Sequence, residues 1–378
     1  MAGKSSSERQ ALARQNAALM AVFERAGFDH IAPDIIQPAD IFLERSGEDI
    51  RARTFVFSDP QGNELCLRPD LTVPACRYHL SHGEAAREAR YCYLGPAFRF
   101  PDEALSPQEF TQAGIEWFGD TEGPAAEARI LKLAVSALEA AGLTKLTVTL
   151  GDLGLFAALL EDVDMPQRWR RRLRHQFWRP QAFRDLLDSY TMGGRGKRTS
   201  ISDMVDALEQ EDALALVKRV ITARALPLVG GRSLEAIAQR LSGKFADRSE
   251  HPLPHTISDT ITRYLALKGT ATEVLKELAA IASGPRFAAA VTRYQQRLDA
   301  MEDQGLNPRR FRFEATFGRE LEYYTGFVFQ VEAPHGKGAI AVAGGGRYDD
   351  LLEDMGAAGK VPAVGCAIHT NRLMAVLS

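Results

Sequence analysis

Residues 67–72 (LRPDLT) combine a carboxylate and a hydroxyl in one short turn. The segment follows a run of β-forming residues, and Pro69 favours an extended Arg68, so the turn can present Asp70 and Thr72 at the end of a strand. The same residues also fit an ordinary connection between a strand and a helix, in which Asp70 caps the helix. This turn alone leaves the binding and the capping interpretations open.

A second group of polar side chains lies on the two β-rich runs that follow. Residues 93–99 (YLGPAFR) end in Arg99, and residues 112–116 (QAGIE) place Gln112 and Glu116 four positions apart. Because side chains alternate between the two faces of a strand, Gln112 and Glu116 point to the same side of a sheet. An acid on a sheet face is often a solvated residue, whereas a Gln–Glu pair opposite an arginine-bearing strand suits a binding site. Both interpretations stay open.

A third segment joins aromatic, charged and glycine residues. Residues 319–329 (RELEYYTGFVF) carry Arg319, Tyr323 and Tyr324 directly before a β-rich run, and residues 341–349 (AVAGGGRYD) follow after a turn. Glycines let a backbone approach a ligand or a neighbouring strand closely, and these three match neither a phosphate-binding loop nor a dinucleotide fingerprint. The glycines alone would indicate a structural turn, but together with the tyrosines and the arginine they favour a binding element.

A sheet is needed to bring these segments together. Strands are predicted at residues 55–57, 65–67, 91–100, 109–119, 145–150, 312–317, 327–331 and 339–343. Helices are predicted at residues 8–26, 124–142 and 371–377. Because strands and helices gather in separate stretches of the chain, the sequence predicts an α+β fold.

The character of the chain changes after the strand at residues 145–150. A mostly helical pattern, rich in Ala, Leu, Arg and Glu, continues until strand signals resume near residue 312. We therefore expect a core that is split into residues 1–150 and 310–378, with a mainly helical insertion at residues 151–309.

Composition and charge argue against several broad classes of protein. The chain has 378 residues, and no apolar stretch approaches the roughly 18 residues of a membrane span. The polar N-terminus lacks the apolar core of a signal peptide, so a cytoplasmic protein is expected. The formal net charge of −3 argues against nucleic acid as the main partner. Six arginines at residues 168–179 crowd one predicted helix, where they form either a solvated basic face or a contact with an acidic partner, nucleic acid or a phosphorylated ligand.

Neither a metal ion nor a cofactor is expected. The four cysteines are scattered and include no C-x-x-C pair, which indicates reduced and mostly buried thiols. Residues 79–82 form an isolated H-x-x-H without further ligands nearby, which is typical of ordinary surface or helix-end histidines.

The motifs LRPDLT, YLGPAFR, TQAGIE, RELEYYTGFVF, AGGGRYD and PAVGCAI…NR stand in the order found in histidyl-tRNA synthetases, and the sequence resembles the catalytic domain of that family. The resemblance covers residues 10–150 and 310–378. It implies a class II aminoacyl-tRNA synthetase-like fold, with a mixed, mainly antiparallel sheet and flanking helices. Class II cores dimerise through a first motif, which here falls at residues 31–41, so the resemblance also implies a homodimer.

The resemblance further implies a histidine-binding site formed by Asp70, Thr72, Arg99, Gln112, Glu116, Arg319, Tyr323 and Tyr324. In relatives, the groups matching Asp70 and Gln112 hold the ammonium of the amino acid, and Thr72 would add a hydroxyl. Glu116 and the two tyrosines fall where the imidazole ring is recognised, and Arg319 falls where the carboxylate is met. Such a set suits a zwitterion, which needs an anion, a cation and hydrogen-bonding groups in one pocket. Asp70 replaces the usual glutamate and is one methylene shorter, which bears on affinity more than on binding mode.

The sequence departs from a synthetase where ATP would bind. Arg99 is followed by residues 100–101 (FP), where the family has the glutamate that helps to seat adenine. The loop beyond contains no Lys or Arg, and its acids are Asp102, Glu103 and Glu109. Three acids beside a polyphosphate repel it rather than neutralise it.

Two more departures lie near the end of the sequence. The last motif, usually G-x-E-R, keeps its arginine as Arg372 but loses the glycine and the acid. The sequence ends at Ser378, so we expect the family's anticodon-binding domain to be absent.

The amino-acid pocket is thus kept while the ATP-binding part is altered. The regulatory subunits of ATP phosphoribosyltransferase have this design: they pair with a short-form catalytic subunit in the first step of histidine biosynthesis and carry feedback sensitivity to histidine. The resemblance implies a non-catalytic subunit of this kind, with histidine as ligand and a homodimer within a larger hetero-oligomer. The alternative is an active class II ligase that forms histidyl-adenylate or loads a non-tRNA acceptor, and the retained Arg319 suits that alternative.

Overall fold

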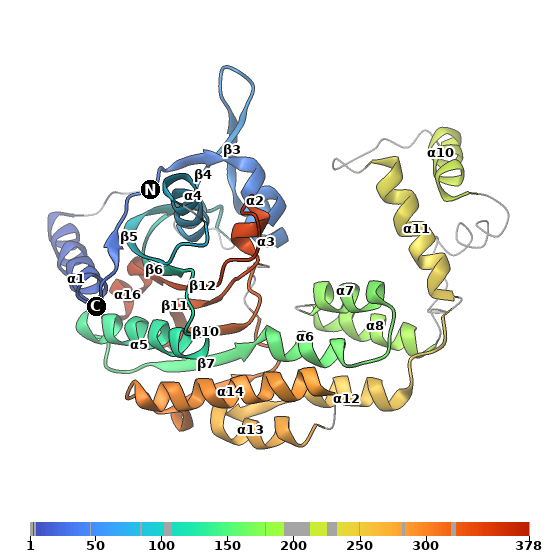
Figure 1. Cartoon of the computed structure of the whole chain (residues 1–378). Helices are drawn as coiled ribbons and strands as arrows, with labels where there is room; N and C mark the ends of the chain where they lie inside the picture. Colours follow the sequence, from blue (N-terminus) through green and yellow to red (C-terminus); the bar gives the residue numbers. More distant parts are fainter. Residues whose placement is uncertain are drawn as a thin grey trace. The chain divides into compact units, whose positions relative to one another are not determined.

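The computed structural model describes residues 3, 5–45, 47–83, 85–101, 108–177, 179–192, 212–224, 233–248, 250–281, 284–318 and 323–377. The chain divides into two compact units, one made of residues 1–158 and 267–378 and the other of residues 159–266. Figure 1 traces both units along the sequence.

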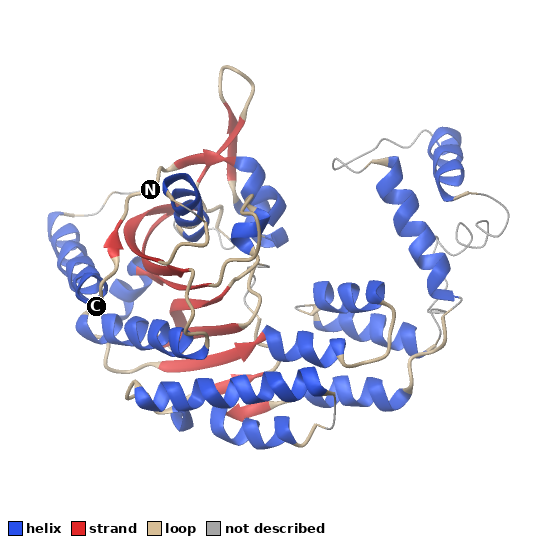
Figure 2. Cartoon of the chain, viewed as in Figure 1, coloured by secondary structure: helices blue, strands red, loops and turns tan. Residues whose placement is uncertain are grey.

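A nine-stranded sheet forms the centre of the first unit (Figure 2). Its strands lie in the order β1 (Asp29–His30), β5 (Ala89–Phe98), β6 (Glu109–Phe118), β12 (Ala363–His369), β11 (Gly338–Arg347), β10 (Phe327–His335), β7 (Thr147–Asp152), β9 (Arg312–Glu314) and β8 (Lys268–Thr270). Neighbouring strands are antiparallel, except for the parallel pairs β1–β5 and β7–β9. The predicted α+β class and the mixed, mainly antiparallel sheet are confirmed.

β12 was not predicted from the sequence, although this strand lies in the middle of the sheet between β6 and β11. Five of its seven residues are buried, in the pattern buried-buried-buried-buried-intermediate-buried-intermediate. A strand that is covered on both faces reads as a continuous apolar run and shows no alternation, so its sequence has no period that distinguishes it from a buried helix. The short edge strand β8 was missed as well, because three residues carry no pattern.

A smaller sheet of three strands lies in the same unit, in the order β2 (Ile36–Pro38), β4 (Glu64–Leu67) and β3 (Phe55–Ser58). The predicted hairpin is the pair β3–β4. Its turn is closed by Asp59, whose Oδ1 accepts hydrogen bonds from the backbone N–H groups of Gln61 and Asn63 at 2.9 and 2.8 Å, the role expected of an aspartate in a turn. The helices next to this sheet in the sequence are α2 (Ala39–Arg45), α3 (Gly47–Arg53) and α4 (Thr72–His82).

Further helices pack against the large sheet. α1 (Ser6–Arg25) begins with a capping box made by Ser5 and Glu8. α5 (Pro124–Ala140) begins with its proline in the first turn and contacts α1, β12 and α14 (Pro285–Asp303). The first unit is completed by α13 (Ala271–Ala279), α15 (Leu351–Asp354) and α16 (Thr370–Leu377).

The second unit is helical in its described residues, as the sequence predicts. Its helices are α7 (Gln167–Gln176), α8 (Pro180–Thr191), α10 (Ala213–Arg224), α11 (Leu234–Arg248) and α12 (His255–Leu265), and α6 (Leu153–Glu161) leads into it. The predicted insertion at residues 151–309 is too long. Residues 267–309 belong to the first unit, because β8 pairs with β9 at the edge of the large sheet and α14 packs on α5.

The predicted basic helix is α7, and part of its charge serves the packing of the second unit. Arg168 and Arg172 both pair with the buried carboxylate of Asp247, and Arg170 pairs with Glu161 at 3.6 Å. These ion pairs give three of the arginines a structural role within the second unit.

Candidate functional site

A cavity of about 890 Å³ lies against the large sheet of the first unit, within the usual size range of small-molecule sites. Its lining comes mainly from β6, β10, β11 and β12, from the turn before α4 and from the tyrosine pair before β10. The predicted site residues that line it are Asp70, Thr72, Arg99, Gln112, Tyr323 and Tyr324. Of the remaining two, Glu116 is buried next to this lining, and Arg319 lies outside the described residues.

Strands β6 and β12 present their polar residues on one face of the sheet. Gln112 pairs with His369, and Glu116 pairs with Gly365. Side chains alternate along β6, so Gln112 and Glu116 point the same way, as their spacing predicts. Their directly paired partners on β12 share this face. Gly365 supplies the space for the acid, because a Cβ atom at this position would overlap the Glu116 carboxylate.

Asp70 is fixed by the turn between β4 and α4. The buried guanidinium of Arg68 donates from Nε to the carbonyl of Pro96 at 2.8 Å and so ties this turn to β5. Asp70 Oδ1 accepts a hydrogen bond from the backbone N–H of Val73 at 3.1 Å, so its carboxylate caps the first turn of α4 as predicted, although the N-cap residue itself is Leu71. Asp70 Oδ2 is buried and has no hydrogen-bond partner among the described residues. One oxygen of the carboxylate therefore serves the fold, and the other is left for a ligand.

The pKa of the Asp70 carboxyl is raised above its ordinary value. Burial raises the pKa of this carboxyl, whereas the positive charge of Arg99 and the backbone N–H groups of Val73 and Thr72 act to lower it. A cationic donor brought to Oδ2 would satisfy a buried acceptor and favour its charged form.

Gln112 and Thr72 place further polar atoms beside this turn. Gln112 Oε1 accepts a hydrogen bond from the backbone N–H of Leu71 at 3.2 Å, which fixes the orientation of the amide. Thr72 also lines the cavity, and its side chain acts to lower the pKa of both Glu116 and Tyr93. Oxygen acceptors thus converge on one end of the cavity, as an ammonium group requires.

Glu116 is held by two tyrosines. Its Oε1 accepts a hydrogen bond from the Tyr93 hydroxyl at 2.9 Å, and its Oε2 accepts one from the Tyr348 hydroxyl. Burial raises the pKa of Glu116 to about 7, although the hydrogen bonds from Tyr348, Thr72 and Tyr93 act to lower it. Because Tyr348 lines the cavity and Glu116 does not, the carboxylate acts on the cavity through that hydroxyl.

Tyr93 and Tyr348 were not among the predicted site residues. Tyr93 pairs with Gly114 across β5–β6, on the same face as Glu116, so strand alternation contained a signal for it once the pairing is known. Tyr348 stands two residues after the glycine run of β11, inside a motif that was of interest for its glycines and arginine. Its role becomes visible only when the chain brings it to Glu116.

Three tyrosines form an aromatic wall. The rings of Tyr323 and Tyr348 meet edge to face with centroids 5.6 Å apart, and those of Tyr323 and Tyr324 lie 4.8 Å apart. Gly346 allows this packing, because a Cβ atom there would lie 3.0 Å from the Tyr324 ring. Rings with hydroxyl tips suit a planar heterocycle that has both a face and polar edges.

The cavity lining also contains Arg99, Phe110, His369 and Arg372. Arg99 donates from Nε to the carbonyl of Pro69 at 2.8 Å, and its guanidinium carbon lies 5.4 Å from the centroid of the Phe110 ring. His369 stacks on the same ring. Of the acids predicted to repel ATP here, Glu109 begins β6 on the surface, and the other two lie outside the described residues.

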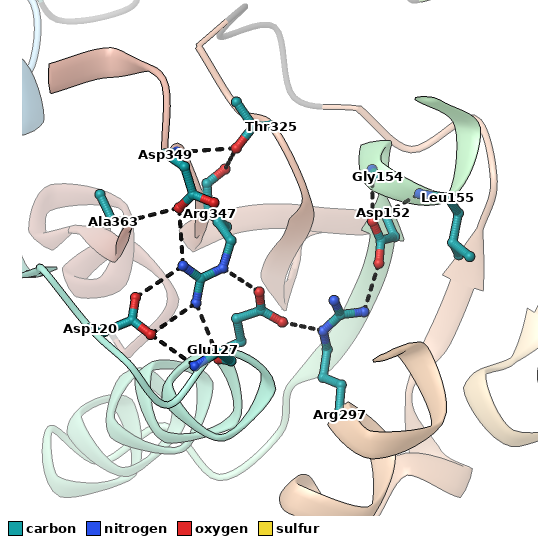
Figure 3. Close-up of polar contacts among 11 residues, drawn as sticks. Asp120, Glu127, Asp152, Gly154, Leu155, Arg297, Thr325, Arg347, Asp349 and Ala363 are labelled. Carbon is teal, nitrogen blue, oxygen red and sulfur yellow. Dashed lines mark hydrogen bonds and ion pairs between the residues drawn. The ribbon is translucent and has the colours of Figure 1, made fainter. Parts of the chain in front are cut away.

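A buried cluster of charges surrounds Arg347, the residue before Tyr348 (Figure 3). Arg347 pairs with Asp120 at 2.9 Å, with Asp349 at 3.0 Å and with Glu127, which also pairs with Arg297. Burial by itself raises the pKa of Glu127, but these two arginines hold this pKa below its ordinary value. The cluster fixes the backbone on either side of Tyr348 and joins β11 to α5 and α14.

Thr325, the residue after Tyr324, is hydrogen-bonded to this cluster, as Figure 3 shows. Its backbone N–H donates to the carbonyl of Arg347 at 2.9 Å, and its hydroxyl accepts a hydrogen bond from the N–H of Asp349 at 3.1 Å. The two bonds hold Tyr324 and Tyr348, the sequence neighbours of these residues, on the same wall.

No metal-binding group of three or more His, Cys, Asp or Glu side chains occurs within the described residues. The four cysteines are buried free thiols, as predicted, and burial raises the pKa of Cys66 and of Cys92 to about 12. Among the described helices, none is both long and apolar enough to cross a membrane.

Comparison with known sequences gives a consistent family. The family model described as histidyl-tRNA synthetase matches residues 5–242 and 214–373. The ATP phosphoribosyltransferase regulatory subunit of Brucella anthropi is 35% identical over 346 residues, which cover 90% of this chain and 90% of that protein. The regulatory subunit of the same name from Brucella canis is 35% identical over 350 residues, covering 90% of this chain and 91% of that protein.

Comparison with solved structures identifies the same fold. A Bacillus halodurans protein described as an ATP phosphoribosyltransferase regulatory subunit/histidyl-tRNA synthetase superposes with a TM-score of 0.69 at 19% identity, covering 100% of this chain and 82% of that one. The apo histidyl-tRNA synthetase of S. aureus superposes with a TM-score of 0.58 at 17% identity, covering 100% of this chain and 72% of that one. At these identities the structures bear on the fold alone, and they support the class II arrangement.

Proposed function

This chain belongs to the histidyl-tRNA synthetase family, within its group of ATP phosphoribosyltransferase regulatory subunits, and on that premise we propose that it binds free histidine and transmits feedback control to a short-form catalytic subunit. A regulatory role in histidine biosynthesis follows from the family. The ligand, the feedback and the assembly are the proposal: histidine in the cavity, no cofactor, no catalytic residue of its own, and a homodimer within a hetero-oligomer.

Asp70 Oδ2 is the observation that carries the histidine proposal. A carboxylate oxygen that is buried without a partner is rare in proteins, because leaving it unsatisfied costs about 1–3 kcal/mol or more. An amino acid's ammonium group supplies the missing donors and a compensating charge. Gln112 and Thr72 stand beside it as further hydrogen-bonding groups.

The imidazole ring of histidine needs a flat surface and polar groups at its edge, and the tyrosine wall offers both. Tyr323, Tyr324 and Tyr348 offer ring faces and hydroxyls, and Glu116 fixes the hydroxyl of Tyr348 as a donor. The other oxygen lone pairs of that hydroxyl can accept from an imidazole N–H, so we assign ring recognition to the tyrosines with Glu116 behind them. Arg99 and Arg319 remain the proposed partners of the carboxylate.

The main alternative is an active ligase that makes histidyl-adenylate. The Phe110 face in the cavity lining is already stacked against His369, which leaves less room for a nucleotide base there. This observation supports the regulatory function over the ligase.

The function is tested by mixing this chain with a short-form ATP phosphoribosyltransferase and following the rate of that enzyme. We expect a stable complex whose rate falls as histidine is added, while the catalytic subunit alone stays insensitive to histidine. A complex that ignores histidine would contradict the feedback role.

Pyrophosphate exchange separates the regulatory function from the ligase. Incubation of this chain with histidine, ATP and labelled pyrophosphate should give no exchange above the background without enzyme. Histidine-dependent exchange would establish the ligase instead.

A further inference from the structure

His369 occupies a stacking position inside the cavity. It is the last residue of β12, and its ring lies parallel to that of Phe110, with centroids 4.5 Å apart and planes inclined by 12°. The register explains this placement, because His369 is paired with Gln112, and Phe110 is the diagonal neighbour two residues away on the same face. Both rings belong to the lining of the cavity.

The chain holds this imidazole in place from several sides. Its Nδ1 accepts a hydrogen bond from the backbone N–H of Arg372 at 3.3 Å. The next two residues tie the start of α16 to β6, since Asn371 Oδ1 accepts from the N–H of Thr111 at 2.7 Å and Thr370 Oγ1 donates to its carbonyl at 3.2 Å. The ring is thereby fixed next to Phe110 and is not a freely rotating surface group.

The surroundings of the stack are those that planar, charged ligands use. An aromatic face takes the base of a nucleotide in a sequence-tolerant way, and arginines beside it attract phosphates. Arg99 lies over Phe110, and Arg53 and Arg372 also line the cavity. The imidazole of His369 therefore covers a surface that a base would stack on.

His369 covers this surface as a neutral ring. Burial, together with the charges of Arg372 and Arg99, lowers the pKa of His369 to about 3. The stacked imidazole therefore adds no positive charge that would attract a phosphate. It is also not protonated, and so not displaced from Phe110, near neutral pH.

We propose that His369 is a built-in plug, which fills the stacking position on Phe110 and so excludes a purine base from that aromatic face. This inference deepens the proposed function, because it concerns the same cavity, and it makes the exclusion of nucleotides depend on a single side chain. The specificity then has two separable parts. Asp70 and the tyrosine wall select the amino acid, and His369 excludes the purine base.

The test measures adenosine and ATP binding to the full chain by calorimetry, for the unchanged protein and for His369→Gly and His369→Ala. Base stacking on an exposed aromatic face predicts that both variants gain affinity for adenosine by about tenfold or more. His369→Phe keeps a ring on Phe110 and should bind adenosine as poorly as the unchanged protein. His335→Gly, at an exposed end of β10, is the matched control and should also leave adenosine binding unchanged.

Free imidazole gives a second readout. It should compete with adenosine in His369→Gly, because it refills the space that the substitution opens. The plug is refuted if the unchanged protein already binds adenosine as tightly as His369→Gly, or if neither small variant gains affinity while remaining folded by circular dichroism.

Histidine binding is measured in the same variants and keeps the two proposals apart. A gain of adenosine affinity in the two small variants, without histidine binding by the unchanged protein, would contradict the proposed function while supporting the role of His369. Histidine binding without a gain of adenosine affinity would do the reverse.

Discussion

At the scale of single residues, Asp70 joins a structural and a ligand-binding role in one carboxylate. Asp70→Asn retains an oxygen that can cap the N–H of Val73 but removes the negative charge that faces the cavity. Since a hydrogen bond to a charged group contributes about 1.5–3 kcal/mol, histidine affinity should fall by about 10- to 100-fold. Isothermal titration of histidine into the variant measures the change.

Asp259→Asn is the matched control for this prediction, because Asp259 is exposed on α12 in the second unit. It should leave histidine affinity unchanged. Equal affinities for Asp70→Asn and the unchanged protein would show that the ammonium of the ligand does not meet this carboxylate.

Glu116 should make folding stability depend on pH. Its pKa is raised to about 7 in the folded protein, so between the unfolded value near 4.5 and 7 the folded state holds a proton that the unfolded state has lost. The contribution of this group is therefore present at low pH and is lost as the pH rises through about 7. The loss amounts to about 3 kcal/mol at most.

Glu116→Gln removes this titration. The difference in unfolding free energy between the variant and the unchanged protein should shift in favour of the variant as the pH rises from about 5 to 8. Urea unfolding across this range measures it, with Glu277→Gln on the exposed face of α13 as the control. A difference that stays constant with pH would mean that Glu116 does not titrate there.

Six of the eight site residues predicted from the sequence line the cavity, because short motifs fix residue types at turns and strand ends. The hydrogen bonds of Glu116 were not predictable in the same way. They depend on Tyr93 and Tyr348, which lie 23 and 232 positions away in the chain. Only the sheet register brings such distant hydroxyls to one carboxylate.

At the scale of elements, the pairing of β6 with β12 forms part of the site, and it depends on the absence of a side chain at Gly365. Gly365→Ala places a Cβ atom against the Glu116 carboxylate and 2.6 Å from the carbonyl oxygen of Ile115. Overpacking of this kind costs about 1–3 kcal/mol, and the displaced Glu116 should release Tyr348 and weaken histidine binding. Thermal unfolding with and without histidine measures both effects.

Gly359→Ala is the matched control, because a Cβ atom there meets nothing within 4 Å. It should change neither stability nor binding. If Gly365→Ala behaves like this control, then the close packing of β12 on Glu116 is not required for the site.

The elements themselves were predictable to different degrees. The hairpin β3–β4 and the strands β5 and β6 carry alternation or turn residues that a sequence shows directly. β12 shows neither, since its residues are buried on both faces, and with it the positions of Gly365 and His369 stayed hidden. The boundary of the helical insertion failed for another reason, because α14 has the pattern of any amphipathic helix, and only its contact with α5 assigns it to the first unit.

At the scale of the whole molecule, the small sheet offers a surface for the proposed homodimer. Of the seven large apolar side chains that are exposed in the described part of the chain, four lie in or beside this sheet: Ile35, Ile36, Val56 and Phe57. Residues 31–41, the predicted first motif, include two of them. Exposed apolar side chains gathered in one place mark protein interfaces.

Ile36→Asp should therefore weaken the dimer. Burying an isoleucine contributes about 1.5–3 kcal/mol, so the dissociation constant should rise by about tenfold or more. Sedimentation over a range of concentrations measures it, and Met192→Asp, an exposed apolar position in the second unit, should have no effect. A chain that sediments as a monomer at all micromolar concentrations would refute the homodimer.

The most direct test of the account is calorimetric titration of histidine into this chain, alone and with the short-form catalytic subunit present. We predict one histidine per chain, with glutamine and lysine failing to bind. Because coupling between two sites is reciprocal, substrate on the catalytic subunit should weaken histidine binding by the same factor by which histidine weakens substrate binding. No histidine binding under either condition would contradict the central claim that this cavity is a histidine sensor.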